Sequence, residues 1–170
     1  RLTAANFMQK EKPTDALWTN ATVDFSMLGV QYDENGNLLS MQQKGIIPGT
    51  STPILVDKLT YTYQTISDGT WSNKLDGVLD NTPNLNQTNN GLLGDFKDET
   101  YNVGGQDYKY DFNGNMVRDN NKKIRVGVAN GIIYNFMDKP QKITIEGKSI
   151  TEFIYDATGS TIGKKITNTI

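Results

Sequence analysis

Residues 110–117 read Tyr110-Asp111-Phe112-Asn113-Gly114-Asn115-Met116-Val117, and this stretch decides the fold of the chain. Tyr110 ends a run in which tyrosines alternate with polar residues, as they do in a strand. Asp111 can accept backbone N–H donors across a turn, and Gly114 supplies the left-handed residue that a short hairpin loop needs. Met116 then begins the return strand. One such stretch therefore predicts one β-hairpin.

The stretch recurs along the chain as an aromatic residue, Asp, two residues, Gly and then the start of a new strand. Its other copies are Tyr32, Asp33 and Gly36, then Tyr155, Asp156 and Gly159, with a degenerate copy at Tyr134, Asn135 and Pro140. Recurrence at about 20 to 25 residues is typical of arrays in which each unit buries its apolar face on its neighbours. In the last copy Thr161 replaces an apolar residue, which predicts that this hairpin shifts its register by one residue.

Alternating apolar and polar residues predict further strands, and Asn130-Gly131 predicts a two-residue turn between strands at 124–128 and 132–136. Helical spacing survives only over residues 14–28, where the alternation of Val23, Phe25 and Met27 favours a strand instead. The predicted fold is all-β: a curved antiparallel sheet of successive β-hairpins, with little or no helix.

The predicted domain organisation is a single segment of a larger protein, covering residues 1–170. Residues 76–105 are rich in Asn, Asp and Gly and show no apolar period, so they are expected to form a long loop inside this segment.

Composition excludes several kinds of chemistry. The chain has no histidine and no cysteine, which excludes disulfides, thiolate or imidazole catalysis, and the usual zinc and haem ligands. The formal net charge is −2, which gives no reason to expect nucleic acid as a partner, and no apolar run is long enough to span a membrane. We therefore predict no enzymatic activity, no catalytic residue, no cofactor and no metal.

Two alternatives stay open at this point. Trp18 and Trp71, with Tyr61 and Tyr63, could form an aromatic platform for sugars, as in a carbohydrate-binding module. Carboxylates such as Asp95, Asp98 and Glu99 could serve a hydrolase, which needs two acids at a set separation. Calcium binding by Asp33 or Asp111 is weighed against a hydrogen-bonded turn aspartate, and the turn is favoured because the loop spacing does not match a calcium loop.

The motifs resemble the YD repeats of bacterial RHS proteins and wall-associated proteins, and more distantly the YD shell of teneurins. The resemblance is most specific from Gly94 through Met116 and on to Lys139-Pro140 and Tyr155-Asp156, an order similar to cell-surface proteins of Bacteroides-like bacteria. It implies a hairpin ribbon that spirals into a hollow shell, at the cell surface or secreted.

The resemblance also implies a function and a set of partners. The chain is expected to be a non-catalytic structural or interaction segment. Its partners would be the rest of the parent repeat protein and either carbohydrate or an encapsulated C-terminal domain. The unpaired strands at the ends of such a ribbon also predict an edge-strand homodimer.

Overall fold

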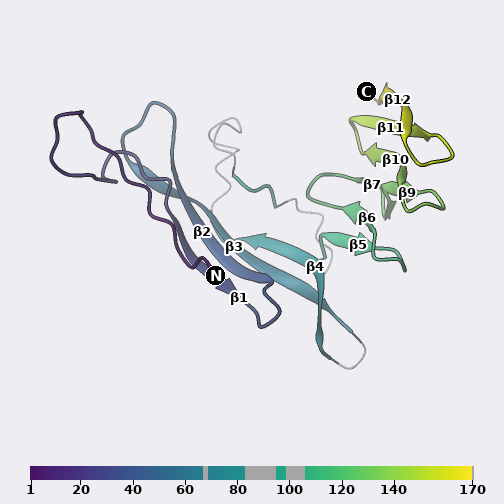
Figure 1. Ribbon diagram of the computed structural model, residues 1–170, viewed down its shortest axis with the longest axis horizontal. Coiled ribbons are helices and arrows are strands. Elements are labelled where there is room, and N and C mark those ends of the chain that lie inside the picture. Colours follow the sequence, from purple (N-terminus) through teal and green to yellow (C-terminus); the bar gives the residue numbers. More distant parts are fainter. Residues whose placement is uncertain (67–68, 83–94, 99–105, 170) are drawn as a thin grey trace. The chain divides into compact units, whose positions relative to one another are not determined.

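The computed structural model is all-β, and about half of its described residues lie in strands that form antiparallel sheets of successive hairpins. It describes residues 1–66, 69–82, 95–98 and 106–169, and these contain no helix. The chain divides into two compact units, Arg1–Asp98 and Glu99–Ile170 (Figure 1). The all-β hairpin fold expected from the repeated turns is therefore confirmed.

The first unit is a four-stranded antiparallel sheet in the order β1-β2-β3-β4. Its strands are β1 (Met27–Tyr32), β2 (Leu38–Ile46), β3 (Pro53–Thr65) and β4 (Trp71–Asp80). The segment before β1 lies beside it, because Ala5 and Met27 exchange backbone hydrogen bonds of 2.8 Å. The buried apolar residues of this unit are Val30, Val56, Leu59 and Val78.

The second unit contains two short hairpins and a four-stranded sheet. The hairpins are β5 (Tyr108–Tyr110) with β6 (Met116–Asp119), and β7 (Arg125–Val126) with β8 (Ala129–Asn130). The sheet has the order β12-β11-β10-β9 and is built from β9 (Ile132–Tyr134), β10 (Pro140–Ile145), β11 (Ser149–Tyr155) and β12 (Thr161–Asn168). The buried apolar residues of this unit are Val117 on β6 and Ile132 on β9. β12 is an edge strand of the four-stranded sheet, and most of its residues are exposed.

The turn expected at Asn130-Gly131 is wrong. Val126 pairs with Ala129, so the chain turns at Gly127 and Val128, and β9 pairs with β10 instead. Gly131 is needed for close approach rather than for a turn, because a Cβ atom there would lie 2.3 Å from the backbone nitrogen of Arg125.

The long loop expected at 76–105 is also wrong in its first part. Residues 76–80 belong to β4, where Val78 and Leu79 pair with Tyr61 and Thr60. Residues 83–94 and 99–105 of that loop lie outside the described residues. Residues 95–98 are described and carry no strand.

Candidate functional site

The turns that follow Tyr32, Tyr110 and Tyr155, which we call YD turns, share one hydrogen-bonding pattern. The N–H of Asp111 donates to the Asn115 carbonyl at 2.9 Å, and the N–H of Gly114 donates back to the Asp111 carbonyl at 3.1 Å. The Asp111 carboxylate accepts the N–H groups of Asn113 and Asn115 at 3.0 and 2.8 Å. Asp33 and Asp156 close their turns with the same backbone pair. These carboxylates are thus turn acceptors, as the sequence predicted.

The degenerate copy keeps this geometry with different residues. The Asn135 side-chain oxygen accepts the N–H groups of Met137 and Lys139 at 2.9 and 3.1 Å, as an Asp does in the other copies. Asp138 replaces the turn glycine and adopts a φ of 54°, whereas Gly114 has a φ of 89°. Asn and Asp are the residues that best tolerate this region. The copy at Tyr134 is therefore a full turn of the series.

Hydrogen bonds lower the pKa of the turn carboxyls. For Asp111, desolvation acts in the opposite direction, but the N–H and side chain of Asn115 outweigh it, so the pKa falls below 3.8. The pKa of Asp33 falls for the same reasons, with Asn37 as the donor. In Asp156 the Thr158 hydroxyl contributes most to lowering the pKa. All three groups therefore favour their charged form in the folded chain.

A fifth turn of this type was missed by the sequence analysis. The N–H of Ile66 donates to the Thr70 carbonyl at 2.8 Å, and Gly69, with a φ of 83°, donates to the Ile66 carbonyl at 2.9 Å. Thr65 pairs with Trp71 across it. No Asp or Asn stands at the position of Ile66, so the dipeptide Asp68-Gly69 is the signal that could have predicted this turn.

Each YD hairpin carries a β-bulge at the same place. The tyrosine pairs with the residue six positions later, and the residue after that is left unpaired. Tyr110 pairs with Met116, and Tyr155 pairs with Thr161 in the same register. The register shift expected from Thr161 is therefore wrong. The unpaired residues are Leu39, Val117, Gln141 and Ile162.

Tyrosine hydroxyls link three of these four hairpins to the hairpin that follows. The residue six positions after the motif tyrosine offers its carbonyl, and a tyrosine of the following hairpin donates to it. The hydroxyl of Tyr134 donates to Met116 at 2.8 Å and that of Tyr155 donates to Pro140 at 2.8 Å. In the first unit Tyr63 donates to Leu38 at 2.9 Å. The motif therefore encodes a hairpin and also its connection to a neighbour.

Side chains of adjacent turns add further links. The side-chain amides of Asn113 and Asn115 both donate to the Asp138 carboxylate, at 2.8 and 3.0 Å. The ammonium of Lys139 donates to the Gly159 carbonyl and lies 5.7 Å from the centre of the Tyr155 ring. Polar contacts thus join three successive turns of the second unit, and pairing of β10 with β11 also joins the last two.

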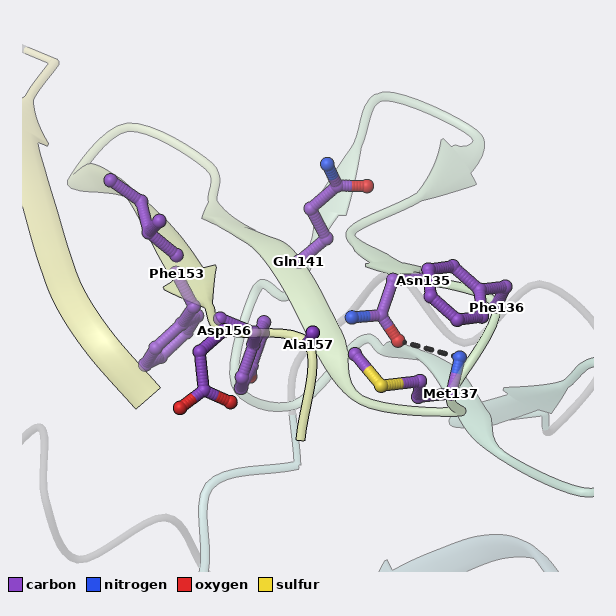
Figure 2. Close-up of a pocket in the computed structure, with 9 residues that line it drawn as sticks. Asn135, Phe136, Met137, Gln141, Phe153, Asp156 and Ala157 are labelled. Carbon is purple, nitrogen blue, oxygen red and sulfur yellow. Dashed lines mark hydrogen bonds between the residues drawn. The ribbon is translucent and has the colours of Figure 1, made fainter. Parts of the chain in front are cut away.

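Adjacent turns also leave a groove between them, and one lies in each unit. The groove of the second unit has a volume of about 580 Å³, with the Phe153 and Asn135 side chains among those along it (Figure 2). A comparable groove in the first unit lies at equivalent positions of its hairpins. The equivalent lining residues are 33–35, Leu39 and Tyr61 in the first unit and 135–137, Gln141 and Phe153 in the second.

The expected tryptophan platform is only partly visible. Trp18 is 60 % exposed, and the ammonium of Lys10 lies 5.8 Å from the centre of its ring. Trp71 begins β4, but its side chain lies outside the described part of the structure. Tyr61 and Tyr63 are half-buried, and the Tyr63 hydroxyl donates a hydrogen bond to the Leu38 carbonyl.

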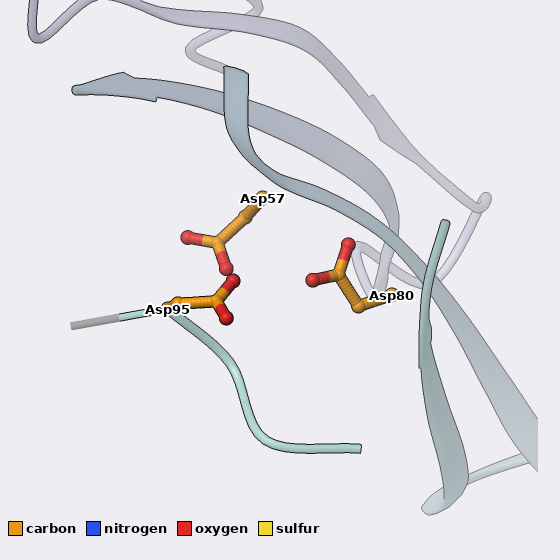
Figure 3. A group of neighbouring side chains, drawn as sticks. All are labelled: Asp57, Asp80 and Asp95. Atoms are coloured by element: carbon orange, nitrogen blue, oxygen red, sulfur yellow. The ribbon is translucent and has the colours of Figure 1, made fainter. Parts of the chain in front are cut away.

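Three carboxylates that sequence analysis did not connect meet in the first unit. Asp57 on β3, Asp80 at the end of β4 and Asp95 place one oxygen each within 4.8 Å of the others (Figure 3). The N–H of Phe96 donates to Asp57 at 2.9 Å, and the N–H of Lys58 donates to Asp80 at 3.0 Å. Oxygens so arranged are of the type that holds a hard cation.

The negative charge of Asp57 is costly in the folded chain. Burial raises the pKa of Asp57, and the charge of Asp80 adds to the rise, while the hydrogen bond from Phe96 opposes it. The hydrolase alternative had grouped Asp95 with Asp98 and Glu99. The structure instead buries Asp95 beside Asp57 and Asp80, and Glu99 lies outside the described residues.

Comparison with known proteins adds no relative, because no family model, curated protein or solved structure matches the chain. In the described ranges 1–66, 69–82, 95–98 and 106–169, the search for a helix long and apolar enough to cross a membrane finds none.

Proposed function

We propose that this chain is a non-catalytic structural and interaction segment of a cell-surface YD/RHS-repeat protein, in which it forms part of a β-ribbon shell or binding surface. The observation that carries the proposal is the repeated contact from a tyrosine hydroxyl to the preceding hairpin, seen at Tyr63, Tyr134 and Tyr155. A contact that recurs at the same place after three of the four YD turns suits a chain whose role is to extend a wall.

The mechanism is mechanical. Each turn reverses the chain, and the following tyrosine fastens the new hairpin to the return strand of the last one. The resulting ribbon would present one face to a partner or to an encapsulated C-terminal domain of the parent protein. Such a role needs no nucleophile, cofactor or metal.

Surface location can be tested in the bacterium that makes the protein. Antibodies raised against the chain should label intact cells, and brief treatment of intact cells with protease should remove the label. A cytoplasmic protein probed in parallel controls for lysis. Labelling that appears only after lysis would refute the cell-surface proposal.

Carbohydrate binding is the second candidate, and the paired grooves favour it. Each groove combines an aromatic side chain, Tyr61 or Phe153, with polar residues of the adjoining turns. Screening the chain on a glycan array tests this function. Binding through the second groove should be lost in Phe153→Ala and kept in Phe112→Ala, because Phe112 is fully exposed and lies outside that groove.

A further inference from the structure

The outer side of β12 is unlike the corresponding side of the other YD return strands. The return strands β2 and β10 are each covered by the next strand, β3 and β11. On β6, the Val117 carbonyl accepts the N–H of Gly131 at 2.9 Å, next to β9. β12 is the return strand of the last YD turn, and among the described residues no strand pairs with its outer side.

The alternation of the ladder shows which groups face outward. Thr169 donates its N–H to the Lys148 carbonyl at 3.0 Å, and Ile150 pairs with Thr167. In an antiparallel pair the bonded residues alternate, so Gly163, Lys165 and Thr167 face β11. The N–H groups of Lys164 and Ile166 therefore point away from the sheet.

Thr161 occupies the acceptor position of the tyrosine contact. It pairs with Tyr155 as Met116 pairs with Tyr110 and as Pro140 pairs with Tyr134. The carbonyls of Met116 and Pro140 each accept a tyrosine hydroxyl from the following hairpin. On the same strand as Thr161, the apolar residues Ile162 and Ile166 are 66 % and 58 % exposed.

We propose that the outer edge of β12 is a docking site for one further hairpin of the Tyr-Asp-x-x-Gly type, whose tyrosine hydroxyl donates to the Thr161 carbonyl. This inference rests on the proposed function, because it names the partner that the segment takes at this edge. The incoming strand pairs antiparallel with β12 through the outward N–H groups of Lys164 and Ile166. The tyrosine contact sets its register, as it does between β10 and β11.

The test is an extended chain. Pro140 and Thr161 hold equivalent positions, so Thr167 is equivalent to Glu146. A second copy of residues 147–169 is therefore joined after Thr167, which keeps the natural turn between the strands. Amide hydrogen exchange is then followed in both chains. The inward N–H groups of Lys165 and Thr167 are the internal control, because they are already bonded to β11.

In the extended chain the N–H groups of Lys164 and Ile166 should exchange at least about tenfold more slowly than in the original chain. Tyr155→Phe in the added copy should reduce that protection about fivefold, since it removes a single hydrogen bond. Unchanged exchange at Lys164 and Ile166 would overturn the docking site, whether or not the added copy folds elsewhere. Equal protection by the Phe copy would overturn the role of the tyrosine contact.

These outcomes are separate from those of the proposed function. A chain found on intact cells that fails to protect β12 would keep its surface role and lose this docking site. A chain absent from the surface that nevertheless protects β12 would keep the docking site and lose the surface role.

Discussion

Asn135 shows what a YD turn requires of its second residue. Its amide oxygen accepts the N–H groups of Met137 and Lys139, whereas Asp111 uses a carboxylate oxygen for the same two contacts. The turn therefore needs an acceptor at this position, and a negative charge is optional at neutral pH.

This comparison predicts how Asp111 contributes to acid stability. Its pKa in the folded chain lies below 3.8, so its contribution is present above that pH and is lost as the pH falls through the folded value. Asp111→Asn should keep the turn and weaken the loss of stability in acid. Asp111→Ala should lower the melting temperature at neutral pH as well. Thermal unfolding followed by circular dichroism at about pH 7 and about pH 3 measures both effects, and identical acid profiles for Asn and Asp would contradict the assignment.

Gly114 is the residue whose backbone the turn constrains most plainly. Its φ of 89° is one that a β-branched residue resists. Gly114→Val should lower the free energy of unfolding by at least about 1 kcal/mol, while Gly114→Asn should cost less, because Asn tolerates positive φ. Denaturant titration of the three chains gives the comparison. A Val variant as stable as the wild type would show that the turn relaxes freely.

Tyr134 tests the contact between hairpins. Tyr134→Phe removes the hydroxyl that donates to Met116 and should cost about 1 kcal/mol of stability, the usual net value of such a bond. Tyr32→Phe is the matched control, because the Tyr32 hydroxyl donates to no group among the described residues. Denaturant titration should therefore give a lower free energy of unfolding for Tyr134→Phe than for Tyr32→Phe. Equal free energies for the two variants would show that the hydroxyl contact between hairpins does not stabilise the chain.

At the scale of strands and turns, sequence reasoning succeeded where the signal is local. The turns at Asp33, Asp111 and Asp156 can be predicted from the sequence, because each has a side-chain acceptor followed three residues later by a glycine. The turn beginning at Ile66 has no such acceptor, so it could not be found in this way.

Contacts between distant residues explain the other errors. Asn130-Gly131 is a strong hairpin signal, yet Glu146 accepts the N–H of Gly127 at 2.9 Å and pairs with Arg125 at 2.7 Å. Those contacts support a turn at Gly127 that no local pattern reveals. The cluster of Asp57, Asp80 and Asp95 was likewise unpredictable, because its members are far apart in sequence and meet only when the sheet forms.

That cluster carries a prediction for the first sheet. The raised pKa of Asp57 means that its stabilising contribution is full at acid pH and is lost as the pH rises through the folded value. Asp57→Asn keeps an oxygen for the Phe96 N–H and removes a buried charge. With a chelator present, it should raise the melting temperature by about 4 °C at neutral pH and by less in acid. A melting temperature that falls at neutral pH would show that the charge itself stabilises the sheet.

At the scale of the whole molecule, the described buried apolar residues are few: Val30, Val56, Leu59 and Val78 in one unit, and Val117 and Ile132 in the other. Buried polar residues accompany them, among them Asp24, whose carboxylate pairs with Lys44 at 2.9 Å. Strand pairing and turn contacts must therefore supply much of the order. The edge strands of such a chain present unpaired backbone groups to which another strand can bind.

The exposed edge of β12 should make the chain associate with itself at high concentration. Ile162 and Ile166 lie on this strand, and its outward N–H groups can pair with a second β12. We expect the mass measured by light scattering to rise with concentration. Ile166→Lys should suppress the rise, because it removes an exposed apolar side chain from the edge and adds a positive charge beside Lys164 and Lys165. Ile66→Lys is the control, since Ile66 is also exposed but lies outside the strands.

The chain extended by one hairpin sharpens this last prediction. The added hairpin covers the outer side of the first β12 but presents the outer edge of its own β12, so the extended chain should still associate unless its added copy carries Ile166→Lys. A chain that stays monomeric at millimolar concentration would refute the edge contact between copies. Association that persists when the added copy of the extended chain carries Ile166→Lys would place the contact on another surface, such as the segment around Ala5 that borders β1.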